Sequence, residues 1–178
     1  MGPPAFSADE TRRWRLLPEL VPRPLWGVSA YRILSRTRWN KIRALVLYQA
    51  ANTCFVCAKV QDKGMVCHEV WNCDDSQHIA QLVRLAILCP DCNFVHHLGR
   101  AGQIGVQDRA VAHMIAVNGM SKADASVVVR TAFEEWEERS QHRWRIAVDD
   151  GLVARFPDFA MLIGLGGRSP IAAAPTTA

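Results

Sequence analysis

The sequence has little that would place it in or across a membrane. Its longest apolar run near the C-terminal end, residues 159–167, is too short and too rich in glycine to span a bilayer. The first residues contain no basic segment followed by an apolar one, so we expect no secretory signal. Pro3 and Phe6 disfavour a myristoylation signal at Gly2. These absences predict a cytoplasmic protein without a membrane partner.

Internal repeats and unusual composition are also lacking. Hydrophobic residues make up 49% of the 178 positions and charged residues 21%, as in ordinary soluble globular proteins. This length is enough for one domain with a substantial core. We expect a loose segment at residues 1–19, a zinc domain at 20–157 with its core at 38–100, and a flexible tail at 158–178.

Six cysteines are present, and without a secretory signal they indicate metal ligands more than disulfides. Cys54 and Cys57 form one CxxC pair, and Cys89 and Cys92 form another. Four thiolates close a tetrahedral Zn²⁺ site with no open position, so we expect a structural zinc ion. A redox-active CxxC is the alternative, which the presence of two pairs disfavours. Cys67 is expected to be a buried or partly exposed thiol, with ligation of a second metal as its alternative.

Apolar spacing and turn signals predict the order of the elements. We expect an extended segment at 20–26 with Trp26 in the core, a helix at 38–50, a strand at 65–71, and an apolar run at 82–88 that contains a second strand. A helix beginning at Pro90 should stop at Gly99, because glycine commonly follows a helix end. Later elements are expected at 106–117 (helix, stopped by Asn118-Gly119), 121–143 (helix, opened by a Ser121–Asp124 capping box) and 143–148 (strand).

Three histidines near the cysteine pairs are considered for chemistry: His68, His96 and His97. His68 stands beside Glu69 on the expected strand, where it could bind a second metal or act as a general base. His97 follows Asn93 by four residues, so the two share a helix face, whereas His96 is expected to point elsewhere. A pocket of His68, Asn93 and His97 would surround one cation. The alternative is a histidine buried in a hydrogen-bonded pocket.

Positive charge is concentrated near the start of the chain, within a formal net charge of +4. A basic region fits a polyanionic partner such as nucleic acid, and a solvated basic face is the alternative. Glutamates at 134, 135, 137 and 138 argue against the outer face of the 121–143 helix meeting nucleic acid. The candidate phosphate contacts are Arg38, Lys41, Arg43 and Arg84.

The order of these motifs resembles the small bacterial HNH-type proteins. The resemblance covers roughly residues 20–156: a Leu-Ser-Arg-x-x-Trp-x-Lys-Ile-Arg segment at 34–43, two CxxC pairs, His68-Glu69-x-Trp71, and His97-x-Gly99. It implies an α+β fold with a treble-clef, or ββα-metal, nuclease core, one helix before it and two after. It also implies an endonuclease that hydrolyses DNA with Mg²⁺ or Mn²⁺ in addition to the structural zinc.

By the same resemblance, His68 is the general base that activates water, and Glu69 orients that base or binds the metal. Asn93 and His97 are the implied ligands of the catalytic ion. The chain departs from the family at three positions: Asn93 replaces the usual histidine, Arg84 the middle asparagine, and Cys73 an aromatic residue. These departures leave a second interpretation, a zinc-stabilised module that binds nucleic acid or protein without cutting.

Overall fold

The computed structural model describes residues 14–165, and the expected α+β class is confirmed. One sheet has the strand order β1-β2-β3, with β1 at Val66–Asp74, β2 at Ile79–Leu88 and β3 at Arg145–Val148. The described residues form two compact units, and β1 and β2 contribute to both. The first unit contains residues 14–20, 46–68 and 86–136, and the second contains residues 21–45, 69–85 and 137–165.

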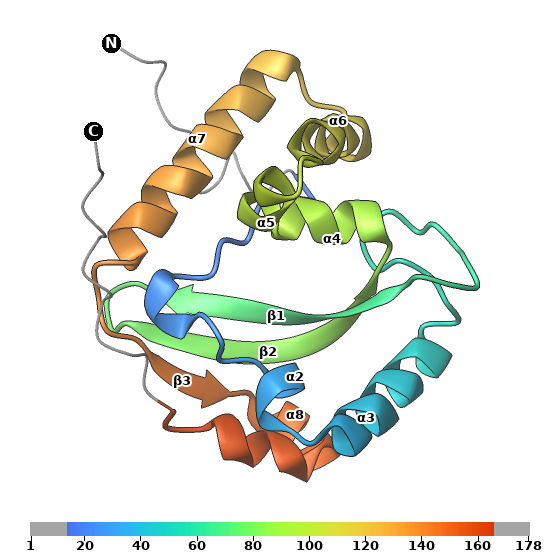
Figure 1. Ribbon diagram of the computed structural model, residues 1–178, viewed down its shortest axis with the longest axis vertical. Helices are drawn as coiled ribbons and strands as arrows, with labels where there is room; N and C mark the ends of the chain where they lie inside the picture. Colours follow the sequence, from blue (N-terminus) through green and yellow to red (C-terminus); the bar gives the residue numbers. More distant parts are fainter. Residues whose placement is uncertain (1–13, 166–178) are drawn as a thin grey trace. The chain divides into compact units, whose positions relative to one another are not determined.

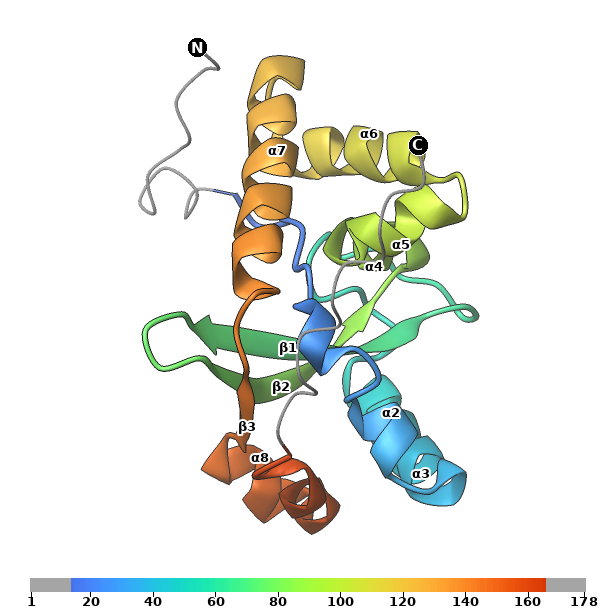
Figure 2. The same cartoon turned by 60° about the vertical axis from the view of Figure 1, so that its left-hand side comes forward.

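The first unit is mainly helical beyond its strand ends (Figure 1). Its helices are α4 (Pro90–His96), α5 (Leu98–Gln103), α6 (Gln107–Asn118) and most of α7 (Lys122–Arg139). Contacts join α6 to α4 and α5, and Val95, Leu98 and Met114 are fully buried among them. Figure 2 shows α7 standing across the end of α6. These packed helices carry several of the candidate site residues.

The turn between α6 and α7 follows the sequence signals closely. Gly119 ends α6 in the left-handed region at φ 62°, which glycine adopts without a steric penalty. Asp124 then donates its backbone N–H to the Ser121 hydroxyl at 3.0 Å, and Ser121 donates its N–H to the Asp124 carboxylate at 3.3 Å. The expected capping box is confirmed, and α7 ends at Arg139, earlier than expected.

Residues 14–20 have no regular secondary structure but are tied to the helices. The Asn118 side chain accepts hydrogen bonds from the N–H groups of Arg15 and Leu16 at 3.0 and 3.1 Å, and it donates to the Leu16 carbonyl at 2.7 Å. Glu19 donates its N–H to the His96 carbonyl at 3.0 Å. The expectation of a loose segment is therefore wrong for residues 14–19, and residues 1–13 lie outside the described part of the chain.

The second unit contains β3 and the short helices around it. The 3-10 helix η1 (Arg23–Leu25), α2 (Ala30–Ile33), most of α3 (Arg36–Gln49), α8 (Asp150–Arg155) and the 3-10 helix η2 (Pro157–Leu162) belong here. β3 pairs with β2 in parallel, from Ile79 opposite Arg145 to Leu82 opposite Val148. Parallel pairing requires a long connection between the strands, and the chain from α4 to α7 provides it.

The end of the described chain is more ordered than expected. η2 buries Phe159 and Leu162 completely, and the backbone of Ile146 exchanges hydrogen bonds with Gly164 and Leu165. The expected flexible tail therefore does not include residues 158–165, because two large apolar side chains there join the core. The remainder of that expected tail, 166–178, lies outside the described residues.

Three further expectations are corrected. The extended segment at 20–26 contains η1, and Trp26 is 52% exposed, with its indole N–H donating to the Val21 carbonyl at 3.0 Å. Gly99 does not end the helix after the second CxxC, because the chain bends at His97 and continues as α5. One helix was expected before the zinc core and two after it. Within the described residues, two helices, α2 and α3, precede the first cysteine pair, and four helices, α5 to α8, follow α4.

Candidate metal centres

Two groups of side chains within residues 14–165 gather three or more potential metal ligands, and both lie in the first unit. In the first group the Sγ atoms of all four expected cysteines lie within 4.8 Å of one another. Cys54 and Cys57 come from the turn after α3, where Phe55 donates its N–H to the Ile87 carbonyl at 2.8 Å. Cys89 precedes α4, and its sulfur accepts the Cys92 N–H at 3.5 Å.

The spacing of these sulfurs fits a tetrahedral ion. Four sulfurs each about 2.3 Å from a central Zn²⁺ lie roughly 3.8 Å apart, and the Sγ atoms of Cys57 and Cys89 are 3.7 Å apart. A hydrogen bond from Cys92 lowers the pKa of Cys54 to about 4 and raises that of Cys92, while burial raises the pKa of Cys89 to about 11. Without a cation, these thiols cannot all be ionised together. The predicted four-cysteine cluster is confirmed, and it could hold a metal ion such as zinc.

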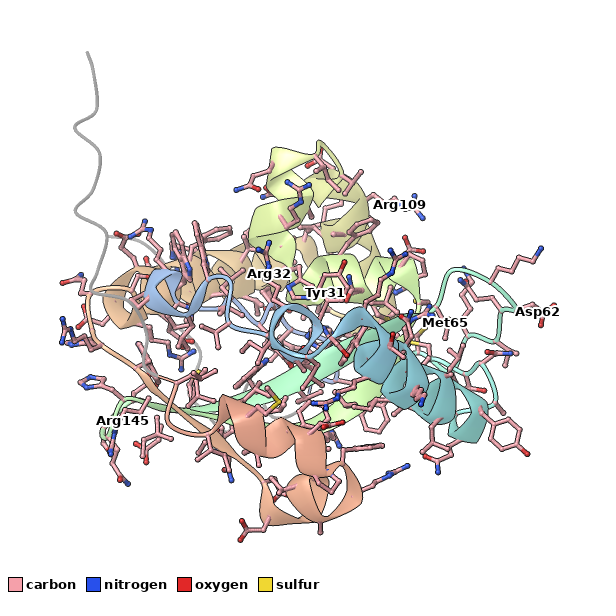
Figure 3. All side chains as sticks on the ribbon, turned by 60° about the horizontal axis from the view of Figure 1, so that its bottom comes forward. Tyr31, Arg32, Asp62, Met65, Arg109 and Arg145 are labelled. Carbon is pink, nitrogen blue, oxygen red and sulfur yellow. The ribbon has the colours of Figure 1, made fainter. Side chains whose placement is uncertain are left out.

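Two side chains of α6 contact the helix that carries Cys92. His113 places Nε2 3.2 Å from the Cys92 sulfur. The Nη2 atom of Arg109, a side chain labelled in Figure 3, lies 2.6 Å from the Asp91 carboxylate. An imidazole N–H pointing at a thiolate stabilises its charge, as residues around metal ligands commonly do. His113 was not predicted from the sequence, because a lone histidine on a helix face carries no spacing signal.

The second group consists of Glu19, His68 and His96. The Nε2 atom of His68 lies 3.3 Å from Glu19 Oε2, and the Nδ1 atom of His96 lies 3.2 Å from Glu19 Oε1. The rings of His68 and His96 stack with centroids 4.9 Å apart. Both histidines are buried, at 5% and 6% exposure, whereas the Glu19 side chain is 37% exposed. The carboxylate is therefore the side of this cluster that meets solvent.

Burial and neighbouring side chains shift the pKa values in and beside the second group. Burial alone would raise the pKa of Glu19, but the adjacent imidazoles of His68 and His96 lower it to about 2. Burial lowers the pKa of His97 to about 4, with smaller effects from His68 and His96, so this imidazole is neutral at pH 7. An ionised carboxylate and the imidazoles beside it together make a donor set typical of metal sites.

The structure brings together some of the predicted ligands. The His97 ring lies 5.0 Å from the His68 ring, as the expected pocket requires. Asn93 has a buried Oδ1 atom with no hydrogen-bond partner within the described chain. His96 was expected to point elsewhere, and this is wrong, because its ring stacks on His68. Glu19 was missed entirely.

Glu69 has a different environment from the one expected beside His68. In the second unit, its Oε1 atom accepts the N–H groups of Ala30 and Tyr31 at 2.9 and 3.4 Å, at the start of α2. Burial raises its pKa to about 7, although these hydrogen bonds and one from Trp71 oppose the shift. The carboxylate satisfies backbone donors that a four-residue helix leaves unpaired.

The candidate phosphate contacts lie on the surface of the second unit. Lys41, Arg43 and Arg84 are exposed, and Arg38 pairs with Asp158 at 3.2 Å. Among the glutamates of α7, Glu137 forms a bidentate pair with Arg23, with distances of 3.0 and 2.7 Å. Nucleic-acid binding by these basic residues stays a prediction.

Comparison with protein-family models, with curated proteins and with solved structures finds no match. Within residues 14–165, no helix has the length and apolar character that crossing a membrane requires. The functional interpretation therefore depends on the geometry of the two clusters.

Proposed function

We propose that the chain is an HNH-type, divalent-metal-dependent endonuclease that hydrolyses DNA phosphodiester bonds on a structural zinc scaffold. The observation that carries the proposal is the position of His68. This histidine lies on β1 between the two cysteine pairs, and its ring contacts His96 and His97 at the end of the helix that follows the second pair. A cysteine knuckle, a hairpin, a second knuckle and a helix, in this order, are the parts of a treble-clef nuclease core.

The chain's own residues provide the polar groups that hydrolysis needs. His68, His96 and His97 place three imidazoles side by side, and Glu19 holds two of them through opposite oxygens. An imidazole in this position can accept the proton of an attacking water, with its orientation fixed by a neighbouring carboxylate. When bound, a divalent ion would neutralise charge that develops on the phosphate and the leaving oxygen. Asn93 and His97, the ligands implied by the resemblance, lie on or next to the same helix.

A plasmid-nicking assay tests the proposal. Zinc-loaded protein is incubated with supercoiled DNA and each of Mg²⁺, Mn²⁺, Co²⁺ and Ni²⁺, and His68→Ala is compared with Cys73→Ser, a substitution outside both clusters. We expect cleavage by the wild type and by Cys73→Ser, and a loss of about 10²-fold or more in His68→Ala, as for removal of a general acid–base group. DNA binding without cleavage under every ion would support the binding module instead.

A further inference from the structure

We infer that Glu19, His68 and His96 together form a binding site for a divalent transition-metal ion. This ligand set differs from the one implied by the resemblance, which uses Asn93 and His97. The site contains two imidazole nitrogens and one carboxylate oxygen, and these atoms all lie within 4.8 Å of one another.

The geometry around His96 favours ion binding over a simple hydrogen-bonded cluster. Its Nδ1 atom is 3.2 Å from Glu19 Oε1, yet it makes no hydrogen bond, although the atom is buried and the residue is only 6% exposed. A buried nitrogen at this distance without hydrogen-bond alignment is costly unless another partner occupies the space. Two atoms that each lie about 2.1 Å from a shared ion are roughly 3.0–3.4 Å apart. The Glu19 distances of 3.2 and 3.3 Å fall in that range.

Several hydrogen bonds hold the three donors in place before an ion arrives. Glu19 is fixed to α4 by its N–H bond to the His96 carbonyl at 3.0 Å, and the segment before it is fixed by Asn118. His96 is the last residue of α4, whose first turn is anchored at the four-cysteine cluster. The zinc scaffold therefore positions one donor directly, and the N-terminal segment brings the carboxylate to it.

The donor types indicate which ion is bound. Imidazole nitrogens favour Zn²⁺, Co²⁺, Ni²⁺ or Fe²⁺, whereas Mg²⁺ prefers a shell of oxygens. Three protein ligands leave coordination positions for water or a phosphate oxygen, as in catalytic rather than structural sites. Glu19, at 37% side-chain exposure, lies on the accessible side. In the proposed nuclease, this assignment makes His68 a metal ligand rather than the general base.

Metal titration of the full chain tests the inference without DNA. The protein is first loaded with one zinc ion at the cysteines, and Co²⁺ is then added while the visible absorption is followed. We expect a second equivalent to bind with d–d bands but without thiolate-to-cobalt charge transfer, because the new ligands are nitrogen and oxygen. Isothermal titration should show Zn²⁺ and Ni²⁺ binding there at least about 100-fold more tightly than Mg²⁺. The absence of a second equivalent, or equal affinity for Mg²⁺, would overturn the assignment.

Matched variants identify the ligands. Glu19→Gln and His96→Gln should each weaken the second equivalent by at least about 10-fold, since even residues that only support metal ligands have effects of 10–100-fold. Glu69→Gln, a half-buried glutamate outside the cluster, and His97→Gln, the neighbouring histidine, should bind as the wild type does. Equal losses in His96→Gln and His97→Gln would contradict the three-donor set. Zinc content and far-UV circular dichroism check the folding of each variant, and the ion series on the wild type decides the question if a variant fails to fold.

These readouts distinguish this inference from the proposed function. Tight binding of the second ion without DNA cleavage would sustain the metal site and reject the nuclease. DNA cleavage without binding of a second metal ion would support the nuclease and reject the metal site.

Discussion

The two clusters of the first unit differ in how far apart their ligands lie in the chain. The four cysteines come from two short motifs, each of which places its two sulfurs in one turn of backbone. Glu19, His68 and His96 come instead from an irregular segment, a strand and a helix end, and only packing brings them together. The four-cysteine cluster is also more enclosed, because Cys54, Cys89 and Cys92 are at most 2% exposed, whereas the Glu19 side chain is 37% exposed.

This difference suggests that the first cluster supports the second. A structural site must remain closed to keep its ion, while a site that acts on a substrate needs an open position. α4 connects them, with Cys92 in its first turn and His96 at its last residue. Loss of the sulfur cluster should therefore disturb both sites, and loss of Glu19 should disturb only one.

The largest effect is expected from Cys89→Ser. Structural zinc contributes on the order of 10–16 kcal/mol to the folding of small zinc domains, so this substitution should remove the zinc and the cooperative unfolding of the first unit. Zinc content by elemental analysis and thermal unfolding followed by circular dichroism measure the two losses. Cys73→Ser is the control, because Cys73 lies outside the cluster. Full zinc content and an unchanged melting temperature in Cys89→Ser would refute the four-sulfur site.

The sequence predicts the first cluster well for a physical reason. Each CxxC pair needs only local backbone geometry, and the apolar runs between the pairs predict the strands β1 and β2. Glu19 has no such motif, since its role depends on a fold that brings residues 14–20 beside α4. One signal did exist: Glu19 is the only acidic residue between Glu10 and Asp62, and it stands in an apolar stretch.

The second largest effect is expected from Asn118→Ala, which should affect the Glu19, His68 and His96 cluster but not the four-cysteine cluster. Its side chain makes three hydrogen bonds to the backbone of Arg15 and Leu16, and each contributes about 1 kcal/mol. We expect the free energy of unfolding to fall by about 2–3 kcal/mol, with faster amide exchange at residues 14–20 and weaker binding of the second ion. Zinc content should not change. Asn40→Ala, at an exposed position, serves as the control, and an equal loss there would show that the effect is not local.

Helical periodicity explains the misplacement of His96. Extending the helix to residue 98 put Asn93 and His97 on one face and His96 on another. In the structure α4 ends at His96, and His97 has φ −100° and ψ 45°, so its side chain no longer follows the helical period. The error concerned a helix end, which depends on how the chain packs after the last turn.

A smaller effect is expected from His113, which tests how strongly the sulfur cluster could hold a zinc ion. Replacing it with phenylalanine removes the imidazole nitrogen 3.2 Å from the Cys92 sulfur, and zinc affinity should fall by about 10-fold, the lower end for residues that support metal ligands. His113→Gln retains a donor and should recover part of that loss. Competition with a chromogenic chelator measures both variants. Identical affinities for the wild type and His113→Phe would show that the imidazole does not stabilise the thiolate.

The smallest effect concerns the two half-buried glutamates Glu19 and Glu69, whose pKa values shift in opposite directions. Histidines lower the pKa of Glu19 to about 2, whereas burial raises that of Glu69 to about 7. Between pH 4.5 and 7 the folded protein keeps a proton on Glu69 that the unfolded chain has released, so this residue makes stability fall as the pH rises through that window. Glu69→Gln still offers an oxygen to the N–H groups of Ala30 and Tyr31 but cannot ionise. Urea unfolding at pH 5 and pH 8 should show a decline that is smaller by on the order of 1 kcal/mol in the variant. An unchanged decline would mean that Glu69 is ionised throughout, and a loss of stability at both pH values would mean that its charge, rather than its shape, holds the start of α2.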